Sequence, residues 1–228
     1  MKWSRQMNNR HETEKQRFAQ GCGFYKLCWI FIIGGVIGCL VETIWCRFAL
    51  GYWMGRSSNA FFPISIVWGI GFALFSLILY KDKETSFWKL FIKGYLCGSA
   101  LEFSCGWLCE KVLHMTFWSY AHLPLNIGGR ISLVFSALWG TVAIIWGKWG
   151  YPAISWIIEK IPKKKGMILT WFLTGYLGIT TVITGFGLIR MAQRHEEKPV
   201  STICDQYLDH YLPDQVLKKV FPKMRFVE

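Results

Sequence analysis

The chain has 228 residues, of which 53% are hydrophobic, 17% aromatic and only 18% charged, and its formal net charge is +12. The charged residues gather at the ends of long apolar runs instead of being spread along the sequence. This distribution excludes an ordinary soluble globular domain and a disordered chain. It also argues against a nucleic-acid-binding protein, because the basic residues flank apolar segments and form no separate domain.

Five apolar segments are long enough to cross a bilayer as helices, which takes about 20 residues each. Their continuous apolarity favours helices over the strands of a barrel, so the predicted fold class is all-α, a polytopic helical bundle in a membrane. A basic leader (residues 1–23) precedes the transmembrane domain (residues 24–190), and a polar amphipathic tail (residues 191–228) follows it. In that tail, apolar residues at helical spacing on both sides of Pro213 predict two short helices. The predicted spans are residues 24–46, 60–80, 87–109, 131–147 and 167–189.

The basic residues beside the spans predict the orientation. The leader and the second and fourth connections carry 15 Lys and Arg residues, against 4 in the first and third connections. The positive-inside rule therefore predicts a cytoplasmic N-terminus, and five spans then place the tail outside. If residues 151–161 entered the membrane, the tail would return to the cytoplasm. We favour a surface position for that stretch, with lysines at lipid headgroups and these side chains in lipid: Ile154, Trp156, Ile157 and Ile161.

The first four spans are predicted to form two tandem helical hairpins, because a pattern recurs along them. A glycine and a glutamate four residues apart lie in the first and third spans, and a Trp-Gly pair lies in the second and fourth. Interfaces between parallel repeats of this kind are a common place for a substrate site. Coincidence among apolar helices is the alternative. The matching segments are Gly38–Glu42 with Gly98–Glu102, Trp68-Gly69 with Trp139-Gly140, and Ile64-Ser65 with Ile131-Ser132.

Charged residues inside the spans are the candidates for function. Glu42, Glu102 and Glu110 fall in the outer halves of the first and third spans, and Arg130 begins the fourth span at the same level. A carboxylate in hydrocarbon is costly unless it is paired, protonated or facing a polar cavity, and an arginine can bridge two carboxylates. We expect these four residues to cluster, either as a lock between the hairpins or as a site for a cation, a proton or a polar headgroup.

The outer loop before Arg130 supplies further candidates. Trp118 and Tyr120 suit the membrane interface, and Asn126 is predicted to cap the start of the fourth span. No metal site is expected, because no C-x-x-C pair occurs and six of the eight cysteines lie in spans. No cofactor is expected. The sequence also has no G-x-x-x-x-G-K-[ST] loop, so ATP hydrolysis would require a separate ATPase subunit.

Six motifs occur in order along residues 24–147: Gly38-x-x-x-Glu42, Leu101-Glu102-Phe103, Trp107-x-x-Glu110-Lys111, Phe117-Trp118-x-Tyr120, Asn126-x-x-Gly129-Arg130-Ile131 and Leu138-Trp139-Gly140. With these motifs, the segment resembles the CmpB-like family, whose description is "putative ABC-transporter type IV". Two positions depart from the family's pattern: Cys39 replaces an aromatic residue, and Ser119 replaces an aspartate. If that aspartate contributes to a site, its contribution is lost here. The resemblance implies a polytopic protein of a bacterial cytoplasmic membrane and says little about substrate.

The leading functional hypothesis is a transporter or permease-like component of unknown substrate, embedded in the lipid bilayer and associated with an ATPase subunit or with a second copy of itself. One alternative is a structural or regulatory membrane subunit without chemistry. Another is a membrane-embedded lipid-modifying enzyme, with Ser119, Tyr120 or Cys109 as nucleophile and His114 or His122 as base.

Overall fold

The computed structural model describes residues 18–80 and 86–227, so most of the predicted leader lies outside the described residues. Apart from two pairs of two-residue strands, the regular structure is helical, which confirms the all-α fold class. The helices are α2 (Phe24–Leu50), α3 (Ile66–Leu79), α4 (Phe87–Leu113), α5 (Leu133–Ile145), a π-helical turn η2 (Trp146–Gly150), α6 (Tyr151–Glu159), α7 (Lys163–His195), α8 (Ile203–Tyr211) and α9 (Asp214–Val220).

The strands form two short antiparallel pairs. Strand β1 (Met115–Thr116) pairs with β4 (Arg225–Phe226), and β2 (Asn126–Ile127) pairs with β3 (Ile131–Ser132). The first pair joins the end of α4 to the C-terminal tail, and the second forms a hairpin just before α5. Neither pair is part of a larger sheet.

Within the described residues, three helical stretches are long and apolar enough to cross a membrane: Phe24–Leu50, Leu133–Glu159 (α5, η2 and α6 taken together), and Lys163–His195. Helix α3 is apolar but shorter, and α4 has the length but carries Lys93, Glu102 and Glu110 along it. The count of five spans therefore stays a prediction. Large apolar side chains are exposed along the helices, among them Phe48, Trp88, Trp171 and Ile179, which fits a surface covered by lipid.

The structure corrects two of the predicted span boundaries. The second predicted span begins at residue 60, but α3 begins at Ile66, because the preceding residues form a loop fixed by side-chain hydrogen bonds. The fourth predicted span begins at residue 131, but residues 131–132 are strand β3 and the helix begins at Leu133. Helix α7 continues to His195, past the predicted start of the tail at residue 191.

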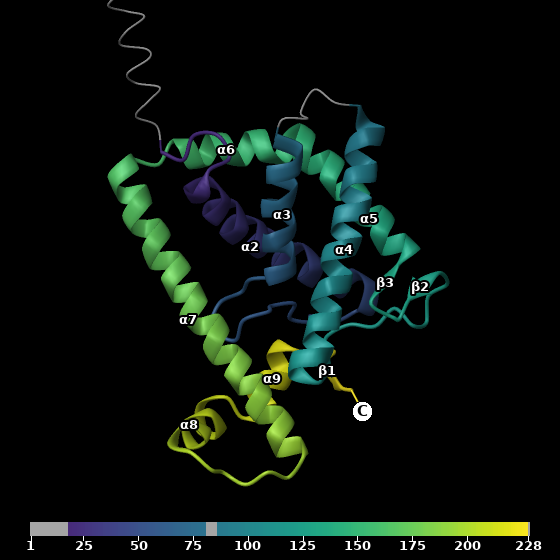
Figure 1. Cartoon of the computed structure of the whole chain (residues 1–228), viewed down its shortest axis with the longest axis vertical. Coiled ribbons are helices and arrows are strands. Elements are labelled where there is room, and N and C mark those ends of the chain that lie inside the picture. The colour runs from purple at the N-terminus through teal and green to yellow at the C-terminus, as the bar shows by residue number, and fades with distance from the viewer. Residues whose placement is uncertain (1–17, 81–85, 228) are drawn as a thin grey trace, which may run out of the picture.

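The helices pack as two hairpins, because the most extensive contacts between elements are those of α2 with α3 and of α4 with α5. The main core lies between these hairpins, the π-helical turn and α6, and its buried members include Ile30, Phe75, Leu90 and Ala143. Figure 1 shows α6 crossing one end of the bundle, whereas α8, α9 and β4 lie at the opposite end. Helix α7 runs obliquely between the two ends.

Helix α6 faces the core differently from the prediction. Ile158 is fully buried, and Ile154 and Ile161 are partly buried against the main core, so these two side chains contact the protein and are not placed wholly in lipid. Trp156 and Ile157 are exposed, as expected. A fully buried Lys26 at the start of α2 also holds α6, because its Nζ lies 2.8 Å from Oε1 of Glu159.

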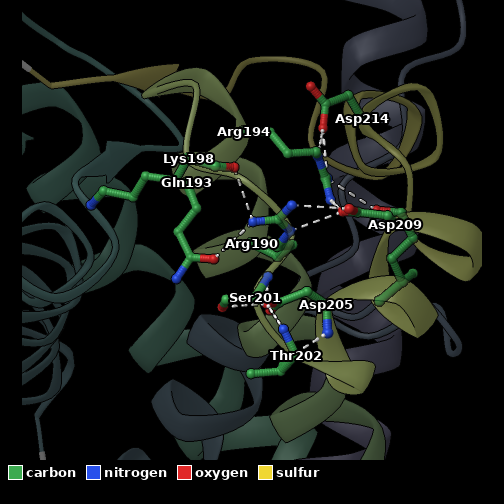
Figure 2. Close-up of polar contacts among 10 residues, drawn as sticks. Arg190, Gln193, Arg194, Lys198, Ser201, Thr202, Asp205, Asp209 and Asp214 are labelled. Carbon is green, nitrogen blue, oxygen red and sulfur yellow. Dashed lines mark hydrogen bonds and ion pairs between the residues drawn. The ribbon is translucent and has the colours of Figure 1, made fainter.

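The tail forms the two predicted helices, α8 and α9, with Pro213 between them. Leu212, Leu217 and Phe221 are buried against Met115 and Met191, so the tail packs on the protein at the end where α4 stops. Arginines of α7 bind acidic residues of the tail, with Arg190 Nη2 3.0 Å from Oδ2 of Asp209 (Figure 2). Both the apolar contacts and the ion pairs therefore fix the tail to α7.

Candidate functional site

The carboxylate of Glu42 lies at the C-terminal half of α2 and has two partners. Its Oε2 accepts a hydrogen bond from Nε of Arg56 at 2.8 Å, and its Oε1 accepts one from the indole N–H of Trp68, also at 2.8 Å. Arg56 comes from the loop between α2 and α3, and Trp68 lies in the first turn of α3. This carboxylate is therefore neutralised within its own hairpin.

The carboxylate of Glu102 lies on α4 and is buried, with the residue 7% exposed. Its Oε1 accepts a hydrogen bond from the hydroxyl of Tyr120 at 2.7 Å, and its Oε2 accepts one from the indole N–H of Trp139 at 3.0 Å. Both donors are neutral. Among the described residues, no arginine, lysine or histidine forms an ion pair with Glu102, so its charge, when ionised, has no counter-ion within this part of the protein.

The two carboxylates occupy equivalent positions in the two hairpins, because each lies one turn beyond a glycine that the tryptophan covers. A Cβ added to Gly38 would lie 2.2 Å from Cγ of Trp68, and a Cβ added to Gly98 would lie 2.4 Å from Cγ of Trp139. Only glycine lets the indole approach the helix so closely. A second pair of contacts is repeated about two turns before Gly38 and Gly98, where Phe31 meets Gly69 and Phe91 meets Gly140.

The two repeats meet through these same tryptophans. The ring centroids of Trp68 and Trp139 are 5.1 Å apart at an interplanar angle of 41°. Phe75 of the first hairpin packs edge-on against Trp139, with centroids 5.9 Å apart. Each indole thus has its N–H on the carboxylate of its own hairpin and its ring against the other hairpin. The predicted repeat interface therefore contains two carboxylates linked by a pair of aromatic rings.

The predicted cluster of four charged residues separates into distinct contacts. Arg130 pairs with Glu110, its Nε lying 3.0 Å from Oε2 of that residue. Within the described residues, Arg130 forms no hydrogen bond or ion pair with Glu42 or Glu102, so it does not bridge two carboxylates. The reason is its place in the β2–β3 hairpin, which brings it beside the last turns of α4, two turns away from Glu102.

The outer-loop candidates hold the loop against the second hairpin. Trp118 donates its indole N–H to the carbonyl oxygen of Arg130 at 3.0 Å, and Tyr120 stacks on Phe135 with centroids 4.4 Å apart. The predicted capping role of Asn126 is wrong, because its Oδ1 accepts from the backbone N–H of Gly129 inside the hairpin turn. The residue that caps α5 is Ser132.

Two polar residues of the loop before α3 have structural importance that the sequence did not reveal. Arg56, counted only as a basic residue, is the ion-pair partner of Glu42. Asn59 is 2% exposed, and its Nδ2 donates to the hydroxyl oxygens of Thr180 and Thr181 on α7 at 2.9 and 3.1 Å. The sequence does contain one signal for this contact. Thr180 and Thr184 are four residues apart, so they form a polar stripe on one face of an apolar helix.

The residues of the enzyme hypothesis are not assembled for catalysis. Among the described residues, neither His114 nor His122 hydrogen-bonds to Ser119, Tyr120 or Cys109. The hydroxyl of Tyr120 is instead committed to Glu102. A nucleophile and its base normally lie within hydrogen-bonding distance of each other, so this arrangement gives the enzyme hypothesis no support.

Comparison with protein-family models gives a match to ABC_trans_CmpB, described as "Putative ABC-transporter type IV", over residues 29–185. The match covers both hairpins, α6 and most of α7, and includes Glu42, Glu102, Glu110 and Arg130. Comparison with curated proteins and with solved structures gave no match.

Proposed function

The chain belongs to the ABC_trans_CmpB family, and from that premise we propose that it is a membrane-embedded transporter component whose ion site is the carboxylate of Glu102. The family and the apolar helices fit a transporter-like membrane protein. The observation that carries the assignment of the site is the burial of Glu102 without a basic partner among the described residues, at the interface of two repeats.

The physical argument rests on the cost of an isolated charge. A buried carboxylate without a counter-ion is strongly disfavoured in its ionised form, so it takes up a proton or a cation. Glu42 and Glu110 do not need either, because Arg56 and Arg130 already neutralise them. Glu102 is therefore the carboxylate whose state can change with the proton or cation concentration, and both tryptophans of the interface are placed to respond to that change.

The test uses Glu102→Gln in the full chain, purified in nanodiscs. Glutamine keeps the size of glutamate, and its amide can accept from the indole N–H of Trp139 and donate to the hydroxyl oxygen of Tyr120, so the fold should survive. We expect the tryptophan fluorescence and the melting temperature of the wild type to change with pH, or when NaCl replaces choline chloride at equal ionic strength, and Glu102→Gln to lose this response. Glu110→Gln is the matched control and should keep it. A response that survives Glu102→Gln, or a wild type that shows none, would contradict the proposal.

The proposed topology has five spans, a cytoplasmic N-terminus and an external tail. The packing of the tail beside the loop 114–132 supports placing both on one side. Cys204 on α8 is exposed, whereas Cys22 lies near α6 at the other end of the bundle. A membrane-impermeant maleimide added to intact cells should therefore label Cys204 and leave Cys22 unlabelled, as read by peptide mass spectrometry. Labelling of Cys204 only after the cells are opened would reverse the placement of the tail.

We also propose that a separate ATPase subunit supplies energy and binds α6. The exposed side of α6 supports this, because Trp156 lies on it with Nζ of Lys160 3.1 Å above the ring centroid. The test is co-purification with an ATPase encoded by a neighbouring gene. Trp156→Ala should weaken the association, and Trp171→Ala, an equally exposed tryptophan on α7, should not. Equal recovery with both variants would assign Trp156 to the lipid surface instead.

A further inference from the structure

A hollow lies away from the repeat interface, between the outer loop and the C-terminal tail. Its volume is about 510 Å³, and the loop contributes Trp118, Ser119 and His122 to its wall. The tail contributes Lys223, Met224 and Arg225. We call this hollow the tail groove.

The two walls of the tail groove are fixed relative to each other. Strand β1 on the loop side pairs with β4 on the tail side, and the backbone N–H of Val227 donates to the carbonyl oxygen of His114 at 2.9 Å. Beneath this pairing Met115 is fully buried, and Phe226 stacks on His195 with centroids 3.9 Å apart. The groove is therefore part of the folded structure and does not depend on a loose end of the chain.

The charge of the tail groove has one sign. Lys223 and Arg225 are exposed in its wall, and no aspartate or glutamate lines it. Within the described residues, neither cation forms an ion pair. The arginines of α7, by contrast, are all occupied by tail aspartates. Two unpaired cations that face a common hollow are a favourable arrangement for an anion.

Hydroxyl donors and an apolar surface complete the wall. Thr116 and Ser119 can each donate a hydrogen bond, and phosphate oxygens accept such bonds strongly. The indole N–H of Trp118 is already committed to the carbonyl oxygen of Arg130, so this residue offers only its ring, beside the thioether of Met224. The wall thus combines cations and hydroxyls with an apolar strip, which suits an anionic group attached to an apolar body.

From these observations we propose that the tail groove binds a phosphate group, carried either by a lipid headgroup or by a small free phosphate. This site does not depend on the ion site at Glu102. It does lie near the second repeat, because a smaller hollow that shares Thr116 and Trp118 with it is also lined by Glu110 and Arg130. An anion bound in the groove therefore lies next to the ion pair that fixes the outer loop to α4.

The test measures binding to the full chain in a maltoside detergent, which contains no phosphate, by calorimetry at constant salt concentration. The two probes are inorganic phosphate and dihexanoyl-phosphatidylglycerol. We expect at least one probe to bind, and the double variant K223Q/R225Q to weaken its binding at least tenfold. Binding of the lipid alone identifies a headgroup site, and binding of inorganic phosphate alone or of both identifies a site for the phosphate group itself.

The matched control is K218Q/K219Q, which removes the same charge from α9 outside the groove. This variant should keep the affinity of the wild type. An equal loss of affinity in both double variants would show general attraction to a basic tail and overturn the proposal, as would the absence of binding by either probe. Tighter binding of a hexaglutamate peptide than of both phosphate probes, with the same dependence on Lys223 and Arg225, would replace the phosphate site with a site for an acidic protein.

Discussion

The two hairpins share one packing arrangement and differ in what neutralises their carboxylate. In the first, Gly38, Trp68 and Glu42 form the repeated unit, and Arg56 adds a positive charge. In the second, the equivalent carboxylate of Glu102 receives only the neutral hydroxyl of Tyr120 in addition to its tryptophan. Packing is therefore the common property of the repeats, and electrostatics is the property that distinguishes them.

The difference comes from the loops and not from the helices. The loop after α2 carries Arg56 back to the carboxylate of its own hairpin. The loop after α4 is longer and contains the β2–β3 hairpin, so its arginine, Arg130, reaches Glu110 near the end of α4, and Tyr120 reaches Glu102. Through the residues that connect them, two similar helical hairpins thus hold one carboxylate paired with an arginine and one bound by neutral donors.

The largest expected effect tests the shared packing. Gly38→Ala and Gly98→Ala should each lower the free energy of unfolding by about 3 kcal/mol or more, because the new methyl group would overlap the indole near its attachment to the backbone. The measurement is chemical unfolding in detergent. Gly175→Ala on α7 is the control, since a Cβ there meets nothing within 4 Å, and it should not destabilise. If only one of the two glycine variants lost stability, the two hairpins would not be packed in the same way.

A smaller effect should reveal the electrostatic difference. Among the described residues, Tyr120 and Trp139 are the two donors to Glu102, so Trp139→Phe leaves a buried acceptor oxygen without a partner, which costs about 1–3 kcal/mol. Trp68→Phe leaves Glu42 paired with Arg56, so its cost should lie at or below the lower end of that range. Thermal unfolding of both variants in the same detergent gives the comparison. Equal losses would mean that Arg56 does not compensate for the indole.

The smallest expected effect concerns the tail, which lies outside both repeats. Hydrogen bonds from Arg190, and then from Arg194, hold the pKa of Asp209 below its ordinary value of about 3.9. The ionised form therefore stabilises the tail above that pH, and the stabilisation is lost as the pH falls through the lowered pKa. Arg190 keeps Gln193 and the carbonyl oxygen of Lys198 as acceptors, so we expect a loss of about 1 kcal/mol.

Hydrogen exchange of the α8 amides measures this loss, once the rates are corrected for the intrinsic pH dependence. The wild type should begin to lose protection as the pH falls below about 4, the ordinary pKa of an aspartate, and should lose more at lower pH. Asp209→Asn should already be less protected at pH 5. The amides of α2 and α4 provide the reference, because their contacts do not involve Asp209. A pH-independent protection of α8 would show that the apolar contacts of Leu212 and Leu217 are sufficient to hold the tail.

Local sequence patterns were informative where local chemistry decides the outcome. Long apolar runs gave the all-α class, the recurrence of Gly-x-x-x-Glu and Trp-Gly gave the two hairpins, and the spacing around Pro213 gave α8 and α9. The starts of α3 and α5 were misplaced, because apolar residues 60–65 and 131–132 continue the hydropathy of the helices although they belong to a loop and a strand. Hydropathy records the surroundings of a residue and not its backbone conformation.

The sequence by itself determined which residues were too costly to place in a membrane without a partner, because the desolvation of a carboxylate does not depend on the fold. The partner of each one was decided only by the tertiary structure. The sequence predicts Arg130 at the same membrane depth as Glu102 and Glu110, but the loop geometry pairs it with Glu110 alone. Arg56 neutralises Glu42 from a loop whose sequence shows no sign of an ion-pair partner. Contacts between loops and helices depend on the path of the backbone, and this path is what leaves Glu102 buried with neutral donors.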